Sequence, residues 1–330
     1  MVTRFVDKVA FVWYCVDYVG GDTMLANQRQ ELILQLLREN GAVTVSNLVQ
    51  TLGVSLETIR RDLKELEKRG HTAIGTDVDN MDITDAAAVR SVLTEANPDV
   101  VIHCAAYTAV DAAEDNIDLC RRINAEGTAN IARVCKALDC KMIYISTDYV
   151  FDGKANTPYA EDDVPAPLSA YGRSKLAGEK AVMESGCRYM IFRTSWLYSR
   201  TGRNFFKTMD EKCAGTPSLK VVVDQAGTPT NAEDLAAFVT GVIENGQLDK
   251  TGLYHFSNEG VASWYDFAKA INDGLGYTCA VQPCRTGEYP AKAARPAYSV
   301  MDKSKVKKAF GVDIPNWRES LDVFIKNYIF

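Results

Sequence analysis

The chain has 330 residues, of which 47% are hydrophobic and 24% are charged, which is the composition of an ordinary globular protein. Its formal net charge of −6 argues against binding nucleic acid or anionic membranes over the whole surface, although a local basic face is compatible with it. The apolar run Val9–Val16 is too short to span a bilayer and no cleavage site follows it, so we expect no membrane attachment and no signal peptide.

The cysteine pattern indicates a reducing compartment. Nine cysteines occur, which is an odd number, and no CxxC pair or Cys/His cluster has metal-ligand spacing. We therefore expect free thiols, a cytoplasmic location and no metal site.

Residues 1–24 form the first region, which contains the β-rich run KVAFVWYCVDYV and ends at Gly20 and Gly21. The β-rich run is a candidate for one strand.

Residues 25–70 are predicted to form three helices. The second helix covers Val45–Leu52, and the third begins after Ser55 and ends at Gly70. This is the helix-turn-helix layout, and the stretch RQELILQLLRENGAVTVSNLVQTLGVSLETIRRDLKELEKRG resembles the N-terminal module of DeoR-type transcription regulators. The resemblance implies DNA contacts by Thr58, Arg60 and Arg61. Seven basic residues against six acidic ones give this module a weak electrostatic attraction for DNA, and the expected β-wing is absent from the sequence.

From residue 71 onward, apolar strands alternate with amphipathic helices, which predicts an α/β fold with a Rossmann-like, doubly wound parallel sheet. We assign 71–196 and 223–257 to this cofactor domain and 197–222 and 258–330 to a smaller substrate domain. Ligands of such sheets bind at the carboxyl ends of the strands. Asp77 follows one strand and could bind an adenosine ribose or form a turn, while Ala105 and Ala106 follow the next and leave room for a cofactor or for tight packing.

The strings ISTDYVFDG and YGRSKLAGEK carry the chemistry. Tyr171 and Lys175 are four residues apart, so on a helix they share one face. An ammonium group near a phenol is expected to lower the pKa of the tyrosine. Thr147 lies at a predicted strand end, where its hydroxyl could hydrogen-bond a carbonyl oxygen. The three residues together predict a site that polarises a ketone and protonates its oxygen as hydride arrives.

The strings HCAAYTAVDAAED, NAEGTANIA, STDYVFDG, SAYGRSKLAGEK, VVDQAGTPT and ARPAYS follow one another in order. Across about 64–330 the chain resembles the dTDP-4-dehydrorhamnose reductases, which are extended short-chain dehydrogenases. The resemblance implies reduction of the C4 ketone of dTDP-4-dehydro-β-L-rhamnose by NADPH or NADH, in dTDP-rhamnose biosynthesis. Some family members are Mg²⁺-assisted homodimers, but no ligand motif in this sequence calls for the metal.

The resemblance also implies roles for individual residues. Tyr171 is the general acid, Lys175 its partner on the nicotinamide ribose, and Thr147 polarises the ketone. Cofactor contacts are expected at Asp77, Asp82, Ile83, Ala105, Ala106, Tyr107 and Thr108. Substrate contacts are expected at Val110, Thr147, Asp148, Trp196, Asn204 and Arg295, where the alternative for Trp196 is a core position.

The sequence departs from this family at its start, where a strand and a Gly-rich, phosphate-binding turn are expected. Counting back from Lys64, the three glycines of this turn would fall at positions 53, 56 and 59, inside the helix-turn-helix module. The residues there are Gly53, Leu56 and Ile59. We therefore expect the module to replace the first βα unit, and three interpretations follow. The chain is a reductase in which residues 8–16 supply the missing strand, a DNA-binding regulator with a degenerate sugar-nucleotide domain, or an inactive fusion.

Overall fold

The computed structural model describes residues 8–12, 72–200 and 202–329. The predicted helix-turn-helix module, with Thr58, Arg60 and Arg61, lies outside the described residues. So does the turn that would follow the first strand.

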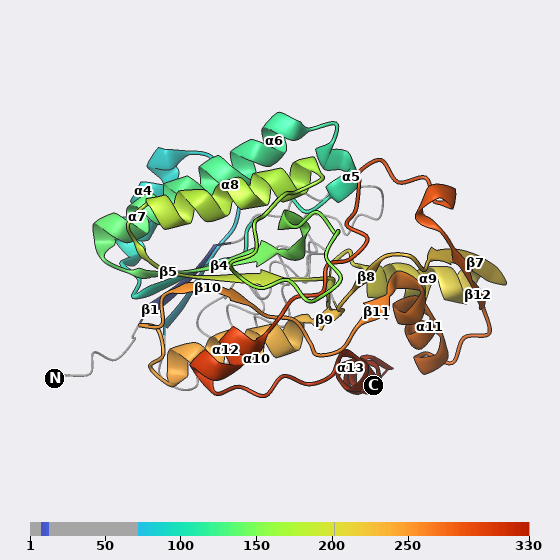
Figure 1. Ribbon diagram of the computed structural model, residues 1–330. Coiled ribbons are helices and arrows are strands. Elements are labelled where there is room, and N and C mark those ends of the chain that lie inside the picture. The colour runs from blue at the N-terminus through green and yellow to red at the C-terminus, as the bar shows by residue number, and fades with distance from the viewer. Residues whose placement is uncertain (1–7, 13–71, 201, 330) are drawn as a thin grey trace, which may run out of the picture.

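A parallel sheet of six strands forms the centre of the molecule, in the order β10-β5-β4-β3-β1-β2 (Figure 1). The order runs outward in both directions from β1 and β3, which is the doubly wound arrangement predicted from the sequence. The strands are β1 Lys8–Val12, β2 Thr72–Thr76, β3 Val100–His103, β4 Lys141–Thr147, β5 Arg188–Thr194 and β10 Gly252–His255.

Strand β1 occupies the interior position that belongs to the first strand of a dinucleotide-binding sheet. Val9 pairs in parallel with Ala73 of β2 on one side and with Val100 of β3 on the other. The side chains of Val9 and Ala10 are completely buried. The hypothesis that the run 8–16 supplies this strand is thus confirmed for Lys8–Val12. The strand of the first βα unit is retained, which corrects the expectation that the whole unit is replaced.

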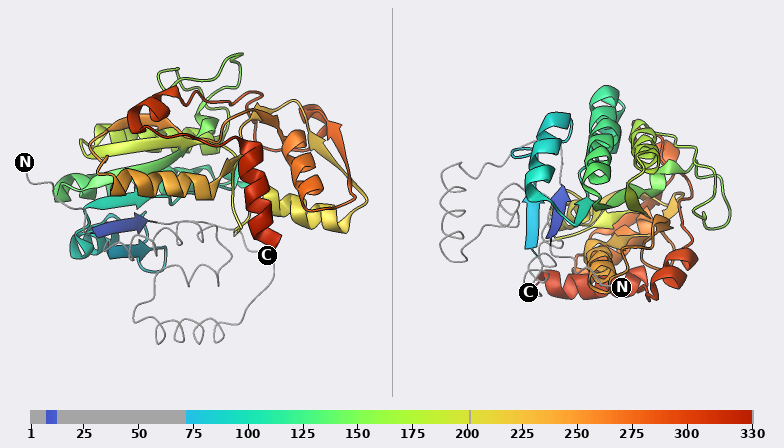
Figure 2. Two further views of the ribbon diagram at one scale, coloured as in Figure 1. Left: turned by 90° about the horizontal axis from the view of Figure 1, so that it is seen from below. Right: turned by 90° about the vertical axis from the view of Figure 1, so that its left-hand side faces the viewer.

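Helices cover both faces of the sheet (Figures 1 and 2). One face carries α4 Ala86–Ala96, α6 Ile117–Arg121, a π-helix at Arg122–Gly127, α7 Thr128–Leu138 and α8 Ala170–Glu184. The other face carries α10 Ala232–Glu244 and α12 Ser304–Phe310. Because both faces are covered, β3 is buried at all four positions, and its first three residues, Val100, Val101 and Ile102, are apolar.

A second, smaller lobe contains three helices and a parallel strand pair, and its core is formed by Phe206, Phe267 and Phe324. Its elements are α9 Phe205–Gly215, α11 Trp264–Gly274, α13 Trp317–Ile329, β7 Ser218–Val222 and β12 Ala280–Cys284. Two short strand pairs lie between the lobes, β6 Leu197–Tyr198 with β9 Thr230–Asn231 and β8 Ala226–Gly227 with β11 Ala262–Ser263.

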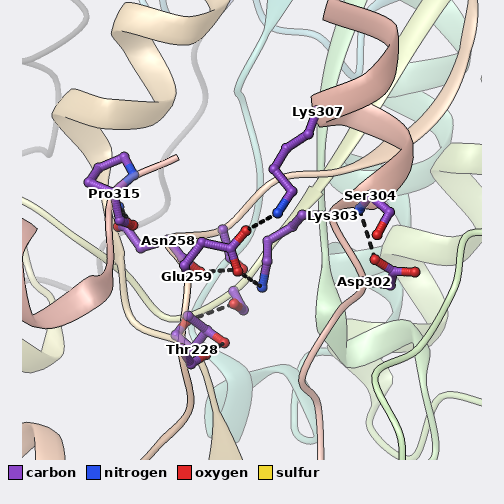
Figure 3. A network of polar contacts seen from close by, with 11 residues as sticks. Thr228, Asn258, Glu259, Asp302, Lys303, Ser304, Lys307 and Pro315 are labelled. Carbon is purple, nitrogen blue, oxygen red and sulfur yellow. Dashed lines mark hydrogen bonds and ion pairs between the residues drawn. The ribbon is translucent and has the colours of Figure 1, made fainter. Parts of the chain in front are cut away.

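Helix α12 lies within the range assigned to the substrate domain, but Val306 and Phe310 pack in the cluster beneath the sheet. Polar contacts fix this helix to the segment that follows β10 (Figure 3). Glu259 accepts from Lys307 at 2.7 Å and pairs with Lys303 at 3.5 Å. The returning chain of 304–314 therefore belongs with the sheet.

Eight cysteines among the described residues are free thiols, seven of them buried, and Cys15 lies outside that part of the chain. Within the described ranges, no helix is both long enough and apolar enough to cross a membrane.

Two glycines set the position of helix α8. The helix begins after Ser169, whose Oγ accepts a hydrogen bond from the backbone N–H of Gly172 at 3.1 Å. A Cβ atom at Gly172 would lie 2.2 Å from the carbonyl oxygen of Tyr149, and one at Gly178 would lie 2.4 Å from that of Asn124. Because these two positions have no side chain, α8 can lie close to the end of β4 and to the π-helix. Helix α8 carries both Tyr171 and Lys175.

Candidate active site

The residues predicted to carry the chemistry come together at the carboxyl end of β4. Thr147 is the last residue of that strand, and Tyr171 and Lys175 lie in the first half of α8. The hydroxyl of Thr147 lies close enough to the phenol of Tyr171 to influence its pKa. This is the edge of a parallel sheet at which ligands bind.

The phenol of Tyr171 has a pKa raised above its ordinary value, chiefly because burial desolvates it, while the nearby hydroxyl of Thr147 opposes the shift. The expectation that Lys175 lowers this pKa is therefore wrong for the structure as it stands. A neutral phenol is nevertheless the form that a general acid requires.

Lys175 is 2% exposed, and its amino group donates a hydrogen bond to the carbonyl oxygen of Ile145 at 2.7 Å. The nitrogen also lies 4.2 Å from the centroid of the Tyr144 ring. Burial lowers the pKa of Lys175 to about 7, and the carboxylate of Glu179 opposes this shift. The amine therefore changes charge close to neutral pH.

This titration gives the first prediction. A lysine whose pKa is lowered to about 7 is charged below that pH and loses its proton above it. If the ammonium form is required, kcat/KM should fall as the pH rises through 7, because the free enzyme loses the cation. A pH profile of kcat/KM measures this. A constant value between pH 6 and 9 would contradict it.

Asp148 follows Thr147 directly and is 2% exposed. Burial raises the pKa of its carboxyl group to about 7, although the nearby hydroxyls of Ser299 and Thr147 oppose the shift. Its Oδ2 atom is buried and has no hydrogen-bond partner. An unsatisfied buried oxygen of this kind is costly unless a ligand completes it, so Asp148 is well placed to accept from a substrate hydroxyl.

Residues predicted to hold the adenosine end follow β2. Asp77 comes directly after this strand and is half-buried. Asp82 accepts hydrogen bonds from the backbone N–H and the hydroxyl of Thr84, so its carboxylate stabilises a turn. Ile83 is completely buried, and a Cβ atom at Gly127 would lie 2.7 Å from its side chain.

Four predicted cofactor residues follow β3. Ala105 and Ala106 are buried and Thr108 is exposed. The backbone of Tyr107 exchanges two hydrogen bonds with the side chain of Asn124, at 2.7 and 3.1 Å.

Asn124 was not identified from the sequence. It lies in the π-helix, and its Nδ2 also donates to Ser174 of α8 at 2.9 Å. π-Helical turns occur often at functional sites, but the sequence NAEG does not predict one. Asn124 joins the segment after β3 to the helix of Tyr171.

Trp196 has φ of 48°, which is unusual for a bulky side chain. Its ring stacks on that of Trp264 with a centroid distance of 3.6 Å and an interplanar angle of 7°. A Cβ atom at Gly227 would lie 2.6 Å from the indole. The expected substrate contact at Trp196 is thus limited, because Trp264 of the smaller lobe covers one face of the ring.

The second prediction concerns this stack. Gly227→Ala should displace the Trp196 indole, since the new methyl group has no room, and overpacking of this kind costs about 1–3 kcal/mol. The exciton signal of the two stacked indoles in circular dichroism should weaken, together with the unfolding free energy. Gly215→Ala is the control, because nothing lies within 4 Å of that position. Equal spectra for both variants would rule out the close packing.

Three other predicted substrate residues already have structural roles. Val110 begins the short helix α5 Val110–Ala113. Asn204 caps α9, where its side-chain oxygen accepts from the backbone N–H of Lys207. Arg295 forms a bidentate ion pair with Asp111, at 2.9 and 3.1 Å, so its donors for a diphosphate are largely engaged.

Two features of the described residues suit a bound dinucleotide. Lys175 and Tyr171 suit the nicotinamide ribose, and the small residues Ala105 and Ala106 suit close approach of a cofactor to the backbone. The pyrophosphate part lacks its usual sequence, since no glycine follows β1 before Gly20. Within the described ranges, no group of three or more metal-ligating side chains comes together.

A doubly wound parallel sheet with a Thr-Tyr-Lys group at the end of its fourth strand in the chain defines the class, the extended short-chain dehydrogenases. A protein-family model described as the RmlD substrate binding domain matches residues 58–330, and the chain belongs to this family. A second model, the DeoR-like helix-turn-helix domain, matches residues 29–74. The two matches overlap over 58–74, which contains the shared string KELEKRG.

Curated relatives and solved structures agree with this assignment. Proteins named dTDP-4-dehydrorhamnose reductase from Sinorhizobium fredii and Mycolicibacterium smegmatis are 39% and 40% identical, over 73% and 77% of this chain and 84% and 77% of their own lengths. A crystal structure of such a reductase from Clostridium acetobutylicum is 42% identical with a TM-score of 0.78, covering 82% of this chain and 95% of that one. The Bacillus anthracis reductase in complex with NADP is 33% identical with a TM-score of 0.81, covering 97% and 99%.

Proposed function

We propose that this chain reduces the C4 ketone of dTDP-4-dehydro-β-L-rhamnose to an alcohol, giving dTDP-L-rhamnose, with NADPH or NADH as the reductant. The observation that carries the proposal is the placement of Thr147 at the carboxyl end of β4 with Tyr171 and the buried amine of Lys175 on α8, in a chain of this family.

The chain's own residues supply the acid chemistry. Thr147 donates a hydrogen bond to the ketone oxygen, which polarises the carbonyl. Tyr171 gives its phenolic proton to the same oxygen as negative charge develops there. Lys175 holds a nicotinamide ribose and stabilises the phenolate that remains. The bound dinucleotide supplies the hydride. Asp148 accepts from a hydroxyl of the sugar and keeps the ketone within reach.

A cofactor-oxidation assay tests this function. Purified full-length chain, incubated with NADPH or NADH and the dTDP-4-dehydro sugar, should oxidise the cofactor and yield dTDP-L-rhamnose. Absence of turnover at millimolar cofactor would favour an inactive fusion. Oxidation without the sugar would point to another substrate.

A second function is supported by the DeoR-like match over 29–74. The chain could bind DNA through Thr58, Arg60 and Arg61, which the family resemblance places in the major groove. A gel-shift assay at low salt should then show binding that is lost in Arg60→Ala/Arg61→Ala, because each phosphate or base contact contributes to affinity. Binding no tighter than that of the double variant would reject this function.

A further inference from the structure

A buried ionic network lies directly behind Lys175. Glu179 follows Lys175 by one helical turn on α8 and is completely buried. Its carboxylate accepts two hydrogen bonds from Arg193, from Nε at 2.9 Å and from the terminal NH2 at 2.7 Å. Ser146 Oγ donates a third at 2.5 Å. The carboxylate is therefore fully ordered by partners from two strands.

The partners of Glu179 form a row across the sheet. Ser146 of β4 is the register partner of Arg193 of β5, which is in turn the register partner of His255 of β10. His255 Nε2 lies 3.4 Å from a guanidinium nitrogen of Arg193. Burial and the neighbouring Arg193 lower the pKa of His255 to about 3, so the imidazole is neutral. The network thus contains one negative charge and one positive charge.

Stability is a weak reason for such a network. Transferring two ions out of water costs several kcal/mol for each, and apolar replacements of buried ion pairs are often as stable. Its position is more informative. Ser146 immediately precedes Thr147, and Glu179 lies on the same face of α8 as Lys175, so the network joins the two elements that carry the proposed catalytic residues.

We propose that Glu179 is a positioning residue: its carboxylate, fixed by Arg193 of β5 and Ser146 of β4, ties α8 to both strands one helical turn from Lys175, and its negative charge at this place favours the ammonium form of that amine. The inference depends on the role proposed above for Lys175. The ionisable groups that act on this amine are Glu179, Cys104 and Cys120, and the Tyr144 ring faces it from β4. Glu179 gives the largest of the interactions that oppose the effect of burial.

The test measures the Lys175 amine itself in the full-length protein. The ¹³Cε resonance of Lys175, assigned with Lys175→Arg, is followed against pH in the unaltered protein, in Glu179→Gln and in Asp234→Asn. Glu179→Gln should move the titration to lower pH. Asp234→Asn is the matched control, because this carboxylate on α10 accepts from Asn258 and Ser320 on the opposite face of the sheet, and it should leave the titration unchanged. An unchanged titration in Glu179→Gln would overturn the proposal.

Glu179→Gln leaves Arg193 buried without its partner, which could prevent folding. The double variant Glu179→Gln/Arg193→Met removes both charges and should still lower the titration of Lys175. In an active enzyme, the alkaline limb of kcat/KM should move to lower pH in the same variants. If the unaltered protein shows no turnover, the proposed function fails, while the resonance titration still decides the role of Glu179.

Discussion

Tyr171→Phe is expected to reduce kcat by roughly 10²- to 10⁴-fold, the usual contribution of a positioned general acid. The substitution removes only the phenolic oxygen and leaves the ring packed edge-on to Tyr149, with a centroid distance of 5.9 Å. The fold and the dinucleotide affinity should therefore change little. Steady-state assays with the dTDP-4-dehydro sugar, together with thermal unfolding, measure both effects.

Tyr254→Phe is the matched control for this substitution. Tyr254 is largely buried and its hydroxyl donates a hydrogen bond to the carbonyl oxygen of Lys250, but it lies in the cluster on the other face of the sheet. Its activity should match that of the unaltered protein. If both variants retain full activity, another group donates the proton and the assignment of Tyr171 as the acid is wrong.

The second large effect concerns the dinucleotide. NADPH and NADH should bind this chain on the order of 10- to 1,000-fold more weakly than they bind reductases whose first strand leads into a Gly-rich turn. Trp13, Tyr14 and Cys15 follow β1 directly, where glycines would let the pyrophosphate approach backbone N–H groups. Each charge-assisted hydrogen bond that is lost costs about 1.5–3 kcal/mol, and 1.4 kcal/mol is tenfold in affinity.

Calorimetric titration of this chain and of a family member with the Gly-rich turn, under identical conditions, gives the comparison. Trp13→Gly/Val16→Gly/Val19→Gly places glycines at the spacing of the fingerprint and should tighten binding, whereas the single variant Trp13→Ala should not. Equal affinities for this chain and the family member would show that the pyrophosphate finds other donors. If no variant gives measurable heat on titration with the cofactor, the proposal that this chain is a reductase is wrong.

The fold of 72–329 could be predicted from the sequence because the strands of the main sheet contain apolar runs and alternate with amphipathic helices. The position of β1 could be stated only as a hypothesis, since a parallel pairing between Val9 and Ala73 joins residues far apart in the chain. Local patterns carry no information about such pairings. The return of the chain to the sheet at α12 was not predicted from the sequence for the same reason.

The chemistry of the site was predictable where it is local and not where it depends on distant contacts. The spacing of Tyr171 and Lys175 placed both on one face of a helix. The raised pKa of Tyr171 results from burial, which no short motif reveals. Arg295 was expected at a diphosphate, but Asp111, 184 positions away, engages it. The ion pair of Glu179 with Arg193 and the stack of Trp196 on Trp264 are likewise contacts made only by folding.

The interior placement of β1 makes residues 8–12 indispensable to the sheet. A deletion ending after Val12 would split the sheet, because β2 and β3 would each lose a hydrogen-bonded neighbour and expose an unpaired edge. Such edges recruit other chains, so a truncated protein should aggregate during expression. Lengthening the connection between two strands destabilises the fold much less, since each doubling of the length of a flexible loop costs only about 0.6 kcal/mol in loop-closure free energy. A helix-turn-helix segment can thus be accommodated between β1 and β2 far more easily than the short strand before it can be lost.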